Sequence, residues 1–258
     1  LGEVRGQTDV ILSEHRPIPL YQHVLINSSL IDLFSQPGKI NPEILALERE
    51  AMRKVRIPRH RREQWGAQES RLSRAEIMEK LNREDLLPAI TFIFSRMGCD
   101  AAVKQCLTAG LKLTNTEERA EIMATAAKYT ANLPEEDLEV LGYREWITAL
   151  ERGIAAHHAG LLPSFKNAVE DLFQRGLVKA VFATETLALG INMPARAVVI
   201  EKLTKYTGEH HQLLKASEFT QLTGRAGRRG LDDIGHAISL WNPFVDFDQV
   251  VGVHIAQA

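Results

Sequence analysis

Three glycines and three arginines lie together in residues 221–230, which read Gln-Leu-Thr-Gly-Arg-Ala-Gly-Arg-Arg-Gly. Glycine lets a backbone turn tightly and approach a ligand closely, and arginine presents a fixed fork of donors that matches phosphate oxygens. The stretch therefore indicates arginines that face a polyphosphate or a nucleic-acid backbone. A solvated basic turn remains the alternative for this stretch alone. It is not a dinucleotide fingerprint, because the glycines follow G-x-x-G-x-x-G and not G-x-G-x-x-G.

Two other segments place polar residues directly after apolar runs. In residues 183–194, Thr184 and Thr186 offer hydroxyls at an expected helix N-terminus, where backbone N–H groups favour an anion. A capped helix followed by a turn is the alternative there. Residues 155–160 hold a histidine pair with no cysteine or carboxylate nearby at ligand spacing, so we predict no metal site. A histidine in this pair could instead touch a phosphate or a sugar.

Composition narrows the class of protein. The chain has 258 residues, of which 45% are apolar and 25% charged, as in ordinary globular proteins. The net charge of −2 means that any contact with nucleic acid must be local. Only Cys99 and Cys106 occur, and we expect both to be buried thiols in a reducing compartment. The sequence shows no apolar run of membrane-spanning length and no signal peptide, so we expect a cytoplasmic protein. We also expect it to be monomeric.

Strand and helix patterns alternate over residues 86–245. Apolar runs predict strands at 89–94, 154–157, 178–182, 197–200 and 236–240. Helical spacing predicts helices at 98–109 and 163–175, and an acidic helical cap at 117–139. This alternation predicts an α/β domain whose mainly parallel sheet is covered by helices on both faces.

The first 85 residues follow a different pattern. We expect an inter-domain arm over residues 1–20, because residues 16–19 (Arg-Pro-Ile-Pro) cannot be helical. Residues 21–85 are predicted to hold an edge strand at 22–26 and a mobile basic insertion, since residues 48–74 contain nine Arg or Lys against four acids. A solubilising loop and a nucleic-acid contact are both open for this insertion. A capping box at residues 73–76 predicts the next helix.

Four motifs occur in a fixed order along the chain: residues 94–97 (Phe-Ser-Arg-Met), 157–161 (His-His-Ala-Gly-Leu), 184–194 and 221–228. They resemble motifs IV, IVa, V and VI of superfamily 2 helicases in the superkiller-like (Ski-type) DExH-box branch. Residues 16–20 resemble the segment that links the two motor domains in that branch. The resemblance covers residues 14–245, and it is specific because the motifs occur together.

The resemblance implies a RecA-like fold for residues 86–245 and a role for individual residues. Arg228 is the first candidate for an arginine finger and Arg225 the second. The other residues implied to face the nucleotide are Gln221, Gly224, Gly190 and Asn192. Those implied to contact nucleic acid are Thr184, His158, Gly160, Ser95 and Arg96.

Two motifs that an ATPase needs are not found in the sequence. There is no G-x-x-x-x-G-K-[ST] phosphate loop and no acidic motif for Mg²⁺ after a strand. We therefore expect this chain to form one wall of an ATP site and not to hydrolyse ATP or bind Mg²⁺ alone. The other wall would belong to an N-terminal motor domain that precedes residue 1, and residues 246–258 would begin a further C-terminal extension.

The sequence thus predicts the C-terminal motor domain of an ATP-dependent helicase that acts on RNA or DNA. Two other functions are weaker. A stand-alone nucleic-acid-binding module should carry basic residues across one face. A nucleotide-dependent small-molecule enzyme should carry a dinucleotide fingerprint or a complete phosphate loop.

Overall fold

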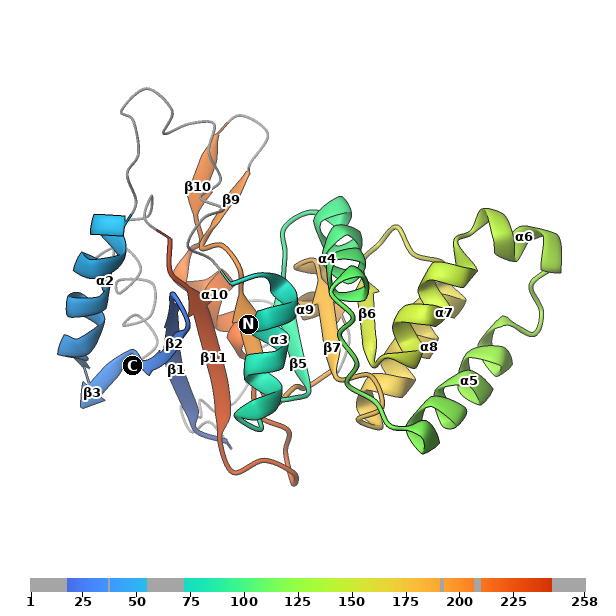
Figure 1. Ribbon diagram of the computed structural model, residues 1–258, viewed down its shortest axis with the longest axis horizontal. Helices are drawn as coiled ribbons and strands as arrows, with labels where there is room; N and C mark the ends of the chain where they lie inside the picture. Colours follow the sequence, from blue (N-terminus) through green and yellow to red (C-terminus); the bar gives the residue numbers. More distant parts are fainter. Residues whose placement is uncertain (1–17, 37, 55–71, 191–192, 207–209, 243–258) are drawn as a thin grey trace, which may run out of the picture.

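A seven-stranded sheet forms the centre of the computed structural model, which describes residues 18–36, 38–54, 72–190, 193–206 and 210–242 (Figure 1). The strand order is β2-β1-β11-β8-β5-β7-β6. All neighbouring strands are parallel except β1 and β2. The strands are β1 (Leu20–Ile26), β2 (Ser29–Asp32), β5 (Ala89–Phe92), β6 (Ile154–His157), β7 (Ala180–Ala183), β8 (Ala197–Ile200) and β11 (Gly235–Leu240).

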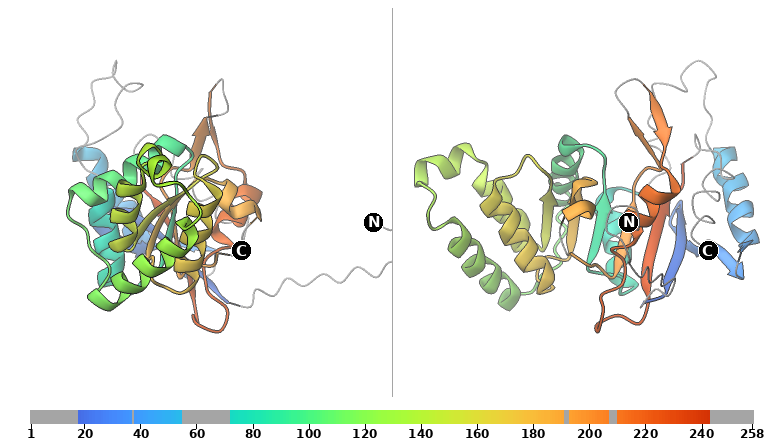
Figure 2. Two further views of the ribbon diagram at one scale, coloured as in Figure 1. Left: turned by 90° about the vertical axis from the view of Figure 1, so that its right-hand side faces the viewer. Right: turned by 180° about the vertical axis from the view of Figure 1, so that it is seen from behind.

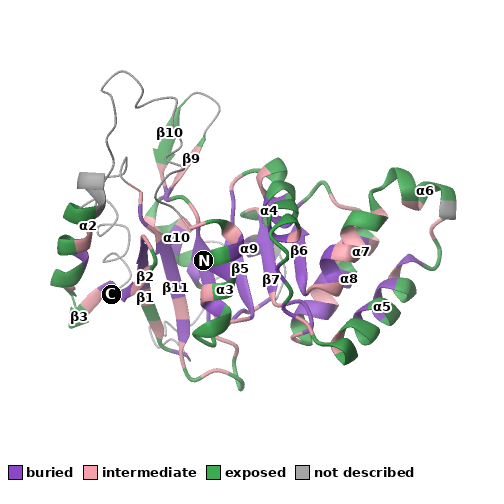
Figure 3. Ribbon diagram, in the orientation of Figure 1, coloured by how far each residue is buried: buried purple, intermediate pink, exposed green. Residues whose placement is uncertain are grey.

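The inner strands are buried on both faces. In β5, Ile90 and Phe92 pack into one apolar cluster, while Ala89 packs into a second cluster on the opposite side. Every residue of β5, β6, β7 and β8 is buried, and Figure 3 shows β5, β6 and β7 in purple. Strands of a parallel sheet that is covered on both faces read as unbroken apolar runs, and this is why the sequence predicted them.

Helices cover both faces, which confirms the predicted RecA-like α/β fold. On one face, α3 (Arg74–Arg83) and α4 (Arg96–Thr108) share an apolar cluster with the sheet. On the other face lie α8 (Pro163–Gln174), α9 (Thr186–Gly190) and α10 (Ala216–Thr223), which Figure 2 shows from behind. The cluster on that face also includes Ile44 of α2 (Pro42–Lys54) and Ile122 of α5 (Thr116–Thr130).

A helical extension lies beyond the β6 edge of the sheet (Figure 1). It contains α5, α6 (Glu135–Val140) and α7 (Tyr143–Glu151), so the acidic segment is helical as predicted. The ring of Trp146 stacks on Phe165 of α8 at a centroid distance of 4.1 Å. Two small hairpins complete the described chain: β3 (Phe34–Gln36) with β4 (Lys39–Ile40), and β9 (Thr204–Tyr206) with β10 (His211–Leu213).

Local signals set several helix ends. The capping box before α3 is confirmed, because the Ser73 hydroxyl accepts from the N–H of Glu76 and the Glu76 carboxylate accepts from the N–H of Ser73. Pro163 lies in the first turn of α8, and Gly176 follows its end with φ of +73°, as the sequence predicted.

Some predictions need correction, and others lie outside the described residues. β1 is not an edge strand, because β2 pairs with its outer side and β11 with its inner side. Apolar side chains at residues 178–182 predicted a strand there, but pairing with β5 and β6 begins only at Ala180. Helix α4 begins at Arg96 and not at residue 98, because Ser95 caps it. The basic insertion predicted from residue 48 is in part wrong, because residues 48–54 are helical and belong to α2. Residues 55–71 of that insertion, residues 1–17 of the predicted arm and the predicted extension over 246–258 lie outside the described residues.

None of the helices that the structure describes is both long enough and apolar enough to cross a membrane.

Candidate functional site

The carboxyl ends of β5, β6 and β7 meet at one edge of the sheet because these strands are parallel neighbours. We call this the carboxyl-terminal edge and define it by residues 95–96, 157–160 and 184–186. Ser95 lies just beyond β5, and its hydroxyl accepts from the N–H of Gly98 at 3.2 Å. The neighbouring Arg96 is exposed and has no hydrogen-bond or ion-pair partner among the described residues.

His158 is buried at the end of β6 with both ring nitrogens engaged. Its Nδ1 accepts from the backbone N–H of Gly160 at 3.2 Å, so Nε2 carries the proton and donates to Oδ1 of Asp100 at 2.9 Å. A Cβ at Gly160 would lie 3.1 Å from His158 Nδ1 and 3.6 Å from Cδ of Arg96. A side chain at Gly160 would therefore crowd His158, and the three predicted residues lie together.

Thr184 joins this edge from the end of β7. Its N–H donates to the carbonyl of His157 at 3.2 Å, and its hydroxyl lies 2.9 Å from that of Thr186. The five residues predicted to contact nucleic acid thus gather at one edge from three different strands. The buried ring of His157 instead faces Glu170, with Nε2 at 2.8 Å from the carboxylate, and burial outweighs that carboxylate to lower the pKa of His157.

Two glycines of residues 221–230, Gly224 and Gly227, meet neighbouring parts of the chain itself. Gly227 has φ of +90°, and a Cβ there would meet Cγ2 of Ile18 at 2.7 Å. A Cβ at Gly235 would meet the backbone of Ala226 at 2.6 Å. Gly224 is the C-cap of α10. The backbone does approach its neighbours closely at these glycines, as predicted. The neighbours are other segments of the same chain.

Arg225 connects the two motifs that the sequence placed beside a nucleotide. Its Nη2 donates to the carbonyl of Ala188 in α9, and its own carbonyl accepts from the N–H of Ala195 at 2.8 Å. Burial lowers the pKa of Arg225. Gln221 is exposed on α10, and Gly190 is the last residue of α9. Asn192 lies outside the described residues.

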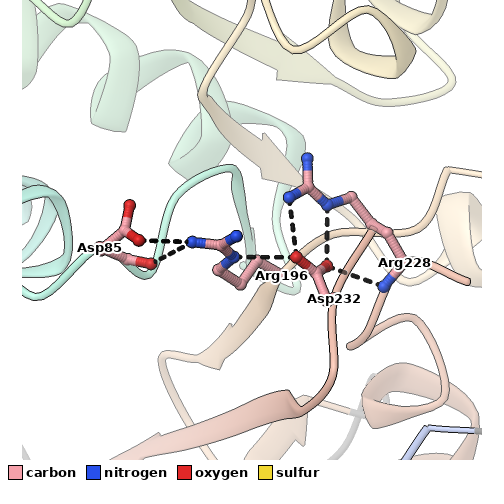
Figure 4. A network of polar contacts seen from close by, with 4 residues as sticks. All are labelled: Asp85, Arg196, Arg228 and Asp232. Carbon is pink, nitrogen blue, oxygen red and sulfur yellow. Dashed lines mark hydrogen bonds and ion pairs between the residues drawn. The ribbon is translucent and has the colours of Figure 1, made fainter. Parts of the chain in front are cut away.

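Arg228 belongs to a four-residue network of ion pairs (Figure 4). Its Nε and Nη2 each donate to a different carboxylate oxygen of Asp232 at 2.8 Å, and its backbone N–H donates to the same side chain at 2.9 Å. Asp232 also accepts from Nε of Arg196 at 2.9 Å, and Nη1 of Arg196 reaches the carbonyl and carboxylate of Asp85 at 2.7 and 2.9 Å.

This network lies at the amino-terminal edge of the sheet. Asp85, Arg196 and Asp232 each shortly precede a strand: β5, β8 and β11, respectively. Ala89 and Ala197, the first residues of β5 and β8, pair with each other, and Ala197 also pairs with His236, the second residue of β11. Arg228 and Thr184 therefore lie toward opposite ends of the parallel strands. We define the amino-terminal edge by the four residues of Figure 4.

Asp232 is the centre of the amino-terminal edge, with a side chain that is only 2% exposed. Burial raises its pKa, but the hydrogen bonds from Arg228 and Arg196 outweigh that effect and hold the pKa well below its ordinary value. The sequence analysis did not find Asp85, Arg196 or Asp232. The spacing of Arg228 and Asp232 at i and i+4 was the one available signal, whereas Asp85 and Arg196 are 111 residues apart.

The chain belongs to the family of the helicase conserved C-terminal domain, which residues 102–230 match. The mixed but mostly parallel sheet and the ordered motifs agree with a Ski-type superfamily 2 helicase. A probable helicase HelY of Mycobacterium leprae is 52% identical over 94% of this chain. The DExH-box ATP-dependent RNA helicase DExH15 of Arabidopsis thaliana is 35% identical over 95%, and human superkiller complex protein 2 is 36% identical over 92%.

The chain spans a small part of these relatives: 28% of the HelY protein, 23% of DExH15 and 20% of the human protein. The matched family region contains every predicted site residue except Ser95 and Arg96, and it ends two residues before Asp232.

Proposed function

We propose that this chain is the second motor domain of a Ski-type, ATP-dependent helicase that translocates on RNA or DNA. The observation that carries the proposal is the state of Arg228. Its guanidinium is bound along one side by Asp232, while Nη1 has no partner among the described residues. An arginine that is held on one side and open on the other is suited to stabilise charge on a phosphate.

The donor set fits a nucleoside triphosphate. Arg225 and Arg228 are three residues apart, so their Cα atoms lie within about 11 Å of each other, and Gln221 is exposed one to two turns earlier. Two guanidinium groups and an amide supply donors for phosphate oxygens. ATP with Mg²⁺ would supply the phosphoryl group for transfer. In that setting, Arg228 would stabilise developing negative charge, and Gln221 and Arg225 would hold the phosphates.

The carboxyl-terminal edge would form part of the nucleic-acid track. Ser95 and Thr184 offer hydroxyls, and Arg96 offers a guanidinium with no protein partner in the described chain. Phosphate contacts of this kind position a strand without reading its sequence. We propose that an N-terminal motor domain contributes the phosphate loop and the Mg²⁺ site. The described residues contain no group of three His, Cys, Asp or Glu side chains that could hold a metal ion.

Replacement of Arg228 by alanine in the full-length enzyme tests this function. We expect kcat for nucleic-acid-stimulated ATP hydrolysis to fall by about 10³, because an arginine finger contributes about 10³ to 10⁵. The Kd for ATP should change far less, since the interaction strengthens with charge that develops during phosphoryl transfer. Arg229→Ala is the matched control, because Arg229 is exposed and has no described partner. A kcat within about threefold of wild type in Arg228→Ala would remove Arg228 from this role.

A further inference from the structure

We propose that Asp232 is a positioning residue for the ATPase reaction, which fixes the Arg228 guanidinium with its open edge toward the nucleotide. The inference rests on the proposed function, because it needs Arg228 to act on a phosphate. It adds a residue that is outside the motif, is almost fully buried and would never touch the nucleotide.

The contact geometry supports this role. A guanidinium is planar and has five N–H donors in fixed directions. Asp232 engages the Nε–H and one Nη2–H of Arg228, each at 2.8 Å. The two Nη1–H groups and the second Nη2–H remain, and Figure 4 shows Nη1 pointing away from Asp232. Because two donors are fixed in one plane, the direction of the remaining three is fixed as well.

Asp232 is itself held in place from two sides. The backbone N–H of Arg228 donates to one carboxylate oxygen at 2.9 Å, and Nε of Arg196 donates to the other at 2.9 Å. Arg196 is in turn bound to the carbonyl of Asp85 at 2.7 Å. These contacts connect the turn after α10 to the segments before β8 and β5. An arginine that is ordered in advance does not lose its rotamer freedom when it meets the phosphate.

The charges of the network leave Arg228 able to attract an anion. One carboxylate bound to one arginine would form a neutral pair, but Asp232 is shared by two arginines. The other carboxylate of the four-residue network, that of Asp85, is 94% exposed and therefore screened by water. Arg228, Asp232 and Arg196 together thus carry a net charge of about +1 at the amino-terminal edge. The positive charge of Arg196 balances the negative charge of Asp232, so the pairing with Asp232 does not cancel the positive charge of Arg228.

A double-mutant cycle separates positioning from simple bracing of the fold. In the full-length enzyme, we expect Asp232→Asn to lower the single-turnover rate of ATP hydrolysis about tenfold and to leave the Kd for ATP within about threefold. In an Arg228→Ala background, Asp232→Asn should cause no further loss, because its effect acts through Arg228. Asp233→Asn is the matched control, since the neighbouring Asp233 is exposed. It should leave the rate unchanged.

Two results of these experiments would contradict the inference. An equal tenfold loss in both backgrounds would show that Asp232 does not act through Arg228 and would overturn the inference alone. A wild-type rate in Arg228→Ala would overturn the proposed function together with it. If Asp232→Asn does not fold, as judged by its melting temperature, Arg196→Gln replaces it. That variant leaves the Arg228–Asp232 pair in place, and its expected threefold loss should also vanish in the Arg228→Ala background.

Discussion

The two edges of the sheet hold the same residue types in opposite states. At the carboxyl-terminal edge, Arg96 is exposed and has no described partner, and Asp100 beside it keeps 59% of its side chain exposed. At the amino-terminal edge, Arg228 is bound on one side and the carboxylate of Asp232 is 2% exposed. The carboxyl-terminal edge presents these charges to solvent, whereas at the amino-terminal edge Asp232, Arg228 and Arg196 are held within the protein and Asp85 alone of the four residues is exposed.

This difference teaches what each edge is suited to do. A solvated cation is appropriate for a nucleic-acid backbone that must slide past it, because such contacts do not depend on the base sequence and are weakened by salt. A guanidinium that is fixed by a buried carboxylate is appropriate for charge that develops at one defined place. The comparison predicts that equal substitutions at the two edges have unequal effects.

The largest difference should be in stability. Asp232→Ala removes the carboxylate that Arg228 and Arg196 share, and the loss of one partner from a buried pair costs about 3 kcal/mol or more. Asp100→Ala should cost about 1 kcal/mol or less, because water can replace its exposed carboxylate beside His158. Urea unfolding of the two variants at pH 7 measures both values. Equal free energies of unfolding for the two variants would contradict the distinction between the edges.

The next effect concerns histidines at the amino-terminal side of the sheet. His23 Nδ1 lies 2.8 Å from Asp32, and its Nε2 lies 2.9 Å from Nδ1 of His236. Burial lowers the pKa of both histidines, although Asp32 and Glu84 act on His23 in the opposite direction. For His236, burial is the largest cause of the lowered pKa. The positive charges of His23 and Arg196 lower this pKa further, whereas the negative charges of Asp232 and Asp32 raise it.

Folding should therefore weaken in mild acid. Each lowered pKa lies below the unfolded value near 6.5, so the unfolded chain binds protons first as the pH falls. The stability is complete above about pH 6.5 and declines below it, by at most about 1.4 kcal/mol per pH unit for each histidine. His236→Asn keeps a donor near the Nδ1 position and should flatten the dependence between pH 7 and 5. The exposed His211→Asn is the control. An unchanged slope in His236→Asn would exclude this pair as a source of the acid sensitivity.

The inner part of the fold was predictable because burial alone determines it. Strands β6 and β8 have the bounds that their apolar runs predicted. β1 was assigned to an edge because its half-apolar sequence shows no partner, whereas it is covered by β2 and β11, the latter more than 200 residues away in sequence. The sequence indicates which residues are buried, but it does not indicate which distant strand pairs with β1.

The residues of the candidate site could be predicted only where they belong to one of the four sequence motifs. Ser95, His158, Gly160 and Thr184 do gather at one edge, as parallel strand ends require. The network around Arg228 could not be predicted, because Asp85, Arg196 and Asp232 come from loops that precede three different strands. Their charges look like ordinary surface residues until the fold brings them together. The glycines of residues 221–230 were expected to allow a close approach of the backbone, and the structure shows that at Gly227 the close neighbour is Ile18.

The smallest expected effect compares two arginines that are exposed and have no described partner, Arg96 at the carboxyl-terminal edge and Arg229 next to Arg228 in the sequence. Arg96→Gln should weaken binding of the full-length enzyme to single-stranded nucleic acid about threefold and reduce the slope of log K against log salt by about 0.7, as expected for one lost phosphate contact. Arg229→Gln, which removes the same charge beside Arg228, should leave the slope unchanged. Fluorescence anisotropy between 50 and 200 mM salt, roughly the range over which phosphate contacts are weakened, measures both slopes. Because the two variants change the net charge equally, a long-range effect of charge would shift both slopes alike. Such a result would remove Arg96 from the nucleic-acid track, whereas a change confined to Arg96→Gln assigns the contact to the carboxyl-terminal edge.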